Sequence, residues 1–137
     1  MKVIKIPYDD TIECTVHDIP DRSDDSVEAS GRVLDDIKKL IGIDCAEVVS
    51  LVVIKNKIPL RDYCFIVDEV GKLKDGWTDM INIRASRFYP GTFEGDPIVG
   101  DVVFCAREWT DSFGECDLAG LTDREEEVMM FHFLRRM

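Results

Sequence analysis

The amino-acid sequence predicts an α+β fold, with a mixed, mainly antiparallel sheet of about five strands packed against two main helices. Short segments rich in valine and isoleucine alternate with turn residues, as in strands joined by hairpins. Two longer segments carry apolar residues at helical spacing. The chain has 137 residues, of which 45% are apolar, so we expect a single globular domain over residues 1–137.

The predicted strands are short and separated by polar turns. In the second of them, Ile12, Cys14 and Val16 alternate with polar residues, which predicts one buried face. The third is the most valine-rich and is predicted to be central in the sheet. The five segments are residues 1–6, 12–16, 46–54, 61–68 and 97–106.

Helices are predicted at three places. The first covers about residues 26–41, and Gly42 follows as the residue that ends it. A shorter helix is predicted near residues 83–89, with Asn82 as its N-cap. The last begins at Thr122–Glu125, a capping box, and ends near two arginines at residues 135–136.

The charge distribution limits the classes of partner. The net charge is −11, and each of the segments Asp9–Glu28 and Glu108–Glu127 contains eight carboxylates and one base. Direct contact with nucleic-acid phosphates is therefore disfavoured. A basic host protein or a small anionic ligand met by the more basic centre of the chain is the expected partner, and a homo-oligomer stays open.

The remaining sequence signals favour a cytoplasmic protein without a cofactor. No apolar segment is long enough to span a membrane and no signal peptide is apparent, so no membrane contact is expected. The five cysteines lack the close spacings of a zinc site or disulfide framework and are expected to be free thiols. His17 and His132 are the only histidines, and no phosphate-binding glycine loop exists, so we expect no enzyme.

One segment, residues 77–89, concentrates groups suited to binding an anion. Asn82, Arg84, Arg87 and Tyr89 surround the start of the short predicted helix. Arginines offer forked donors to phosphate or carboxylate, and an aromatic ring offers a stacking surface for a base. The alternative is an ordinary amphipathic helix with solvated arginines. We take the four residues as the predicted ligand-binding site.

A series of short motifs also resembles a known family. They are Ile41–Glu47, Val67–Leu73, Asn82 with Ala85, Ile98–Phe104 and Leu121–Glu125. This order, from about Val33 onward, is similar to a family of small phage- and mobile-element-encoded proteins that carries only a domain-of-unknown-function label. The family has asparagine where this chain has Asp68. The resemblance implies a phage or mobile-element setting, hence the cytosol of a host cell, and it carries over no catalytic residues.

These observations leave three functions open. The first is a non-enzymatic counter-defence protein that sequesters an anionic nucleotide-type signalling ligand at the predicted site. The second is an acidic DNA mimic that inhibits a host nucleic-acid-binding defence protein through the two acidic segments. The third is a metal-dependent enzyme that acts on a small nucleotide. The first two differ in where they place the contacts, at the basic centre or at the acidic ends.

Overall fold

The computed structural model describes residues 1–20, 27–50, 62–89, 92, 95–109 and 116–134. Their strands form one six-stranded sheet in the order β2-β1-β5-β4-β3, with β6 also paired to β5. Each of these pairings is antiparallel. The strands are β1 (Lys2–Ile6), β2 (Thr15–Asp18), β3 (Ala46–Ser50), β4 (Asp62–Asp68), β5 (Val102–Trp109) and β6 (Cys116–Ala119).

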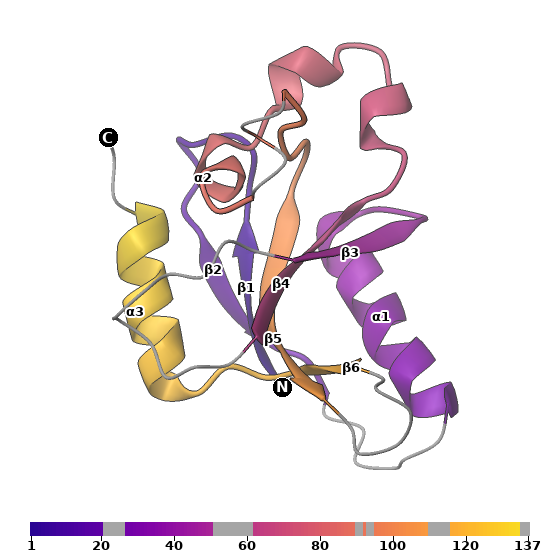
Figure 1. Cartoon of the computed structure of the whole chain (residues 1–137), viewed down its shortest axis with the longest axis vertical. Helices are drawn as coiled ribbons and strands as arrows, with labels where there is room; N and C mark the ends of the chain where they lie inside the picture. The colour runs from indigo at the N-terminus through magenta and orange to yellow at the C-terminus, as the bar shows by residue number, and fades with distance from the viewer. Residues whose placement is uncertain (21–26, 51–61, 90–91, 93–94, 110–115, 135–137) are drawn as a thin grey trace.

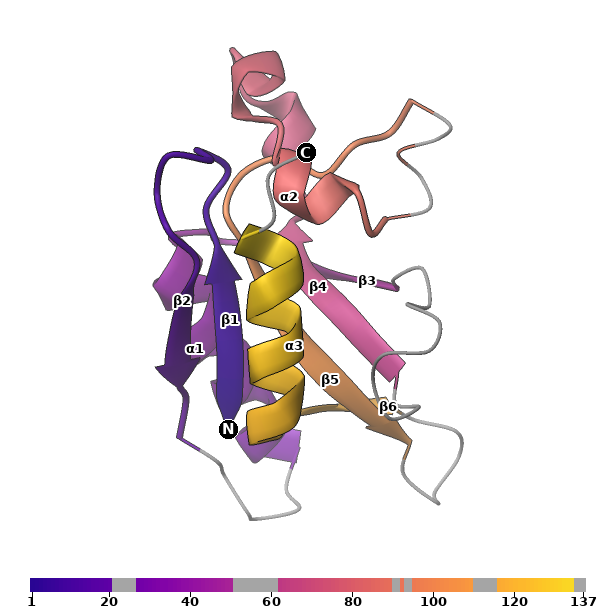
Figure 2. The ribbon, with the colours of Figure 1, turned by 90° about the vertical axis from the view of Figure 1, so that its left-hand side faces the viewer.

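Helices cover both faces of this sheet. Figure 1 shows α1 on one side of the sheet and α3 on the other, and Figure 2 shows α3 running alongside β1. The helices are α1 (Val27–Ile41), α2 (Ile83–Ser86) and α3 (Asp123–Leu134), with 3₁₀ turns η1 (Gly71–Leu73) and η2 (Trp77–Met80). The predicted α+β fold, with a mainly antiparallel sheet and two main helices, is confirmed.

Strand alternation sends side chains into two separate cores. On β5, Phe104 faces α3, whereas Val103 and Cys105 face α1. The core beneath α3 contains an aromatic cluster in which Phe104 and Phe133 are 5.3 Å apart between ring centroids. The core beneath α1 is aliphatic and contains Ile37. The period-two pattern of the strands thus gives the sheet two buried faces.

The second strand lies later in the chain than predicted. β2 starts at Thr15, whereas the alternating pattern predicted residues 12–16. A turn takes up the intervening residues, because the Asp9 side chain accepts hydrogen bonds from the backbone and hydroxyl of Thr11 at 3.0 and 2.6 Å. The Ile12 amide then donates to the Asp9 carbonyl, and Ile12 is left exposed. A local side-chain turn here overrides the period-two pattern.

Three more differences concern the second half of the chain. The predicted strand at residues 97–106 is β5, which begins only at Val102 because Ile98 and Gly100 bond to the segment before α2. The strand β6 was not predicted. The short predicted helix is limited to α2, with Arg87 as its C-cap. The third predicted strand, expected to be central, is β3, which stands at the end of the strand order and pairs only with β4 among the described strands. Residues 51–54 of that predicted strand and the arginines at 135–136 lie outside the described residues.

The strands β1 and β6 lie end to end along the same edge of β5. Val102–Phe104 pair with β1, and Ala106–Trp109 pair with β6. At the junction, a Cβ on Gly120 would lie 2.9 Å from the Lys2 backbone nitrogen and 3.1 Å from the Met1 Cα. Only glycine fits this approach without displacement of the first strand.

Candidate functional sites

Asn82 lies inside the protein, where its side chain joins three backbone segments. It is fully buried and caps α2, because its Oδ1 accepts from the Ala85 amide at 3.1 Å. Its Nδ2 donates to the carbonyls of Ile6 and Gly100, both at 2.9 Å. The predicted N-cap is confirmed, and the amide group is occupied by the end of β1 and the segment before β5.

Arg84 is also turned toward the backbone. Its Nη2 donates to the carbonyls of Pro7 and Asp9, at 2.6 and 3.0 Å, and the side chain is buried. Its Nε is buried and has no hydrogen-bond partner among the described residues. Ser86, two residues on, accepts from the Ile98 amide at 2.9 Å. Alternate side chains of α2 therefore hold the surrounding loops together.

Arg87 and Tyr89 lie apart from that network. The Arg87 Nη2 donates to the His132 carbonyl near the end of α3 at 3.2 Å, and its guanidinium lies 5.8 Å from the centre of the Phe88 ring. Tyr89 is half-buried against the core beneath α3. The structure brings Asn82 and Arg84 together at the end of β1, but Arg87, three residues further on, contacts a different element.

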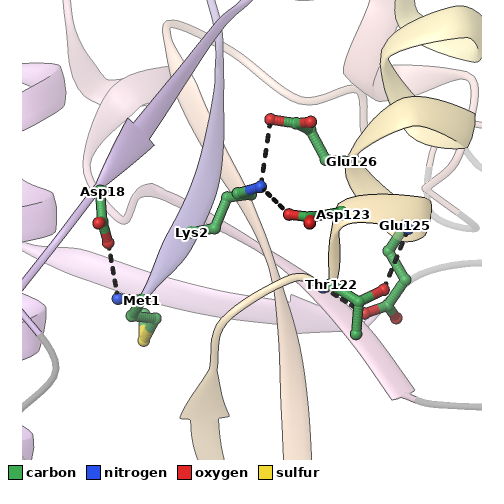
Figure 3. Close-up of polar contacts among 7 residues, drawn as sticks. All are labelled: Met1, Lys2, Asp18, Thr122, Asp123, Glu125 and Glu126. Atoms are coloured by element: carbon green, nitrogen blue, oxygen red, sulfur yellow. Dashed lines mark hydrogen bonds and ion pairs between the residues drawn. The ribbon is translucent and has the colours of Figure 1, made fainter.

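A second group of polar residues joins the two acidic segments, which are far apart in the sequence. The Met1 amino group donates to Asp18 Oδ1 at 2.9 Å and to the Ile19 carbonyl at 2.7 Å. Lys2, the next residue, pairs with Asp123 at 2.5 Å and with Glu126 at 3.5 Å (Figure 3). Two consecutive residues thus contact both acidic segments: Met1 binds a carboxylate of β2, and Lys2 binds two carboxylates of α3.

These contacts shift the pKa values of Asp18, Asp123 and Lys2, while the two carboxylates stay exposed to solvent. The hydrogen bond and positive charge of the Met1 amino group lower the pKa of Asp18. The hydrogen bond and charge of Lys2 lower the pKa of Asp123, and that bond raises the pKa of Lys2. The side chains of Asp18 and Asp123 remain 88% and 96% exposed. Both carboxylates are therefore ionised at neutral pH and accessible to a partner.

The second acidic segment also contains a buried structural carboxylate. Glu125 Oε1 accepts from the Thr122 amide at 2.8 Å, and Thr122 Oγ1 accepts from the Glu125 amide at 3.2 Å. Its other oxygen accepts a hydrogen bond from the Tyr63 hydroxyl on β4. The predicted capping box is confirmed, and it ties α3 to the sheet. Glu125 is consequently unsuited to an interface.

Sequence reasoning did not identify the role of Met1 and Lys2. The only signal was that Lys2 is a base near one end of a chain whose last helix begins with carboxylates. Register and strand order were needed to bring β1 next to both α3 and β2. The acidic segments themselves were identified from composition.

Within the described residues, no group of three or more His, Cys, Asp or Glu side chains is placed to hold a metal ion. None of the helices described is long and apolar enough to cross a bilayer. Comparisons with protein-family models, curated proteins and solved structures find no match to this chain.

Proposed function

We propose that this protein is a non-enzymatic binding protein that uses its acidic surface to occupy a basic surface of a partner protein. One observation carries the proposal: two consecutive residues, Met1 and Lys2, contact carboxylates from the two acidic segments, and Asp18 and Asp123 are almost fully exposed. By contrast, the donors of Asn82 and the Nη2 of Arg84 already bond to backbone carbonyls. The acidic surface is thus the part of the molecule presented to a partner.

The partner we propose is a nucleic-acid-binding protein of the host cytosol. A groove that binds DNA or RNA carries lysines and arginines spaced to meet phosphates, and much of its affinity is electrostatic. A protein of net charge −11 with paired, exposed carboxylates would compete for that groove. The mobile-element setting implied by the resemblance makes a host defence protein the proposed target. Such binding would weaken as salt concentration rises.

Sequestration of an anionic nucleotide is the second candidate, and the geometry favours it less. A ligand at the predicted site would have to replace the bonds that Arg84 donates to Pro7 and Asp9. Breaking buried hydrogen bonds to a charged group costs about 1.5–3 kcal/mol each, so the ligand would have to recover that loss. Arg87 and Tyr89 remain the candidate contacts for such a ligand.

Two variants with equal net charge test the proposal. Asp18→Asn/Asp123→Asn changes the surface around Lys2, and Asp35→Asn/Asp44→Asn changes carboxylates on the α1 side of the sheet. Each removes two negative charges from the total of −11, leaving −9. Carboxyl–amine zero-length cross-linking in host extract, followed by mass spectrometry, identifies partners of each protein. The same experiment is repeated with an excess of duplex DNA.

We expect the wild-type protein and the α1-side variant to cross-link to the same nucleic-acid-binding protein, with DNA abolishing the product. The Asp18→Asn/Asp123→Asn variant should lose most of it. Equal loss in both variants would mean that only total charge matters and would refute this surface as the contact. A product that persists in excess DNA would refute competition for a nucleic-acid groove.

A further inference from the structure

Two cysteines face each other across the two adjacent central strands β4 and β5. Cys64 and Cys105 are partners in the antiparallel register, their Sγ atoms are 3.6 Å apart, and both side chains are fully buried. They lie in the core beneath α1 with Ile37. Cα atoms of antiparallel partners are separated by about 4.5–5.5 Å, which is within the range that a disulfide requires. The sulfurs must approach by only about 1.5 Å to bond.

We propose that Cys64 and Cys105 form a redox-sensitive pair, which an oxidant of the peroxide class converts into a disulfide across β4 and β5. One sulfur, as a thiolate, attacks a peroxide oxygen and becomes a sulfenic acid, and hydroxide leaves. The second sulfur then attacks the first and displaces water. The two thiols lose two electrons and two protons, and one hydrogen peroxide is reduced to two waters.

Access to the pair limits the rate of this reaction. The hydrogen bond with Cys64, together with burial, raises the pKa of the Cys105 thiol well above its usual value. Little thiolate therefore exists while α1 is packed against the sheet and covers the two sulfurs. Cys45, which is exposed, should react first. The buried pair should react when α1 separates transiently from the sheet.

The disulfide would stabilise the sheet against unfolding. It would join residues 41 positions apart and reduce the number of conformations open to the unfolded chain. The linked strands already lie beside each other, so the folded state needs little adjustment. Oxidation should therefore raise the midpoint of urea unfolding by about 1 M or more.

The test uses the full chain with Cys45→Ser, which removes the exposed thiol. The protein is treated with hydrogen peroxide, unreacted thiols are alkylated under denaturing conditions, and tryptic peptides are analysed by mass spectrometry. We expect a Cys64–Cys105 linked peptide, two hydrogens lighter than the reduced pair, and a urea midpoint that rises and is restored by a phosphine reductant. Adding Cys105→Ser should abolish both changes.

Two cavity variants test the route of access. Ile37→Ala weakens the core beneath α1, and Met129→Ala weakens the core beneath α3; both side chains are fully buried. Disulfide formation should be at least about fivefold faster in Ile37→Ala, since only that core covers the sulfurs. Equal rates would refute access beneath α1. In the wild-type protein, complete oxidation of the exposed Cys45 marks the time needed for an accessible thiol to react. If no Cys64–Cys105 linked peptide has formed after ten times that treatment, the proposed pair is refuted. A urea midpoint that falls on oxidation would refute it as well.

Discussion

Replacing Asn82 with alanine should destabilise the protein strongly, although the residue lies in the segment predicted to bind a ligand. The variant loses three hydrogen bonds and leaves the Ile6 and Gly100 carbonyls and the Ala85 amide without that partner in a buried place. Each lost bond costs about 1 kcal/mol, and a buried group left unsatisfied costs about 1–3 kcal/mol. We expect a total of about 3–5 kcal/mol, a large fraction of the roughly 5–15 kcal/mol by which domains are stable.

The assay is equilibrium unfolding in urea followed by far-UV circular dichroism. Ile83→Ala, one residue away and 62% exposed, is the matched control and should change stability by less than about 0.5 kcal/mol. Asn82→Asp keeps the shape and the acceptor for Ala85 but loses the two donors, so it should also be strongly destabilised. A loss below about 1 kcal/mol for Asn82→Ala, with an unchanged denaturant slope, would refute the structural role assigned to this side chain.

Three further predictions follow from backbone packing, capping and charge. Gly120→Ala should cost about 1–3 kcal/mol in urea unfolding because its Cβ would meet the Lys2 backbone, whereas Gly71→Ala, with room at 3.6 Å, should stay within about 0.5 kcal/mol. Thr122→Ala removes the N-cap of α3 and should lower stability by about 1 kcal/mol in the same assay. The lowered pKa values of Asp18 and Asp123 stabilise the folded state above their unfolded pKa of about 4, and this contribution is lost as pH falls through the folded values. Below about pH 4, the thermal midpoint of the Asp18→Asn/Asp123→Asn variant should therefore fall less steeply with decreasing pH than that of the wild-type protein.

Local signals in the sequence predicted the helices well. The capping box at Thr122–Glu125 and the N-cap at Asn82 depend on contacts three residues apart, and both form as expected. The start of β2 was misplaced because the Asp9 side chain builds a turn that the hydrophobic pattern does not encode. β6 was missed because it is four residues long and its pairing with β5 is a tertiary contact.

The predicted site shows why residue type alone does not assign function. Asn82 and Arg84 have the donors that an anion would attract, but the carbonyls at the end of β1 lie within their reach and receive those donors instead. The sequence cannot show this, because Ile6 and Pro7 are more than seventy residues away from them. The acidic segments were identified from composition alone, but composition did not show that one of their carboxylates, Glu125, is buried and bonded to Tyr63 and Thr122.

The two candidate functions can be separated at Arg87, which does not share the network of Arg84. Replacing Arg84 would confound binding with folding, because its two carbonyl bonds hold the loop after β1. Arg87→Lys keeps the charge but loses the planar fork, so it tests recognition of a phosphate with less change in packing. A nucleotide that binds the folded state at 100 times its dissociation constant stabilises it by about 2.7 kcal/mol, an easily measured rise in thermal midpoint.

We therefore expect that a panel of mono-, di- and cyclic nucleotides leaves the thermal midpoint of the wild-type protein unchanged. Arg87→Lys should behave in the same way, because the acidic surface and not this arginine is the proposed contact. The opposite result is equally specific. A nucleotide that raises the midpoint of the wild type but not of Arg87→Lys would establish the anionic-ligand site and refute the acidic surface as the primary function. Glu127→Gln, an exposed carboxylate on α3, is the control, since it alters charge without touching Arg87.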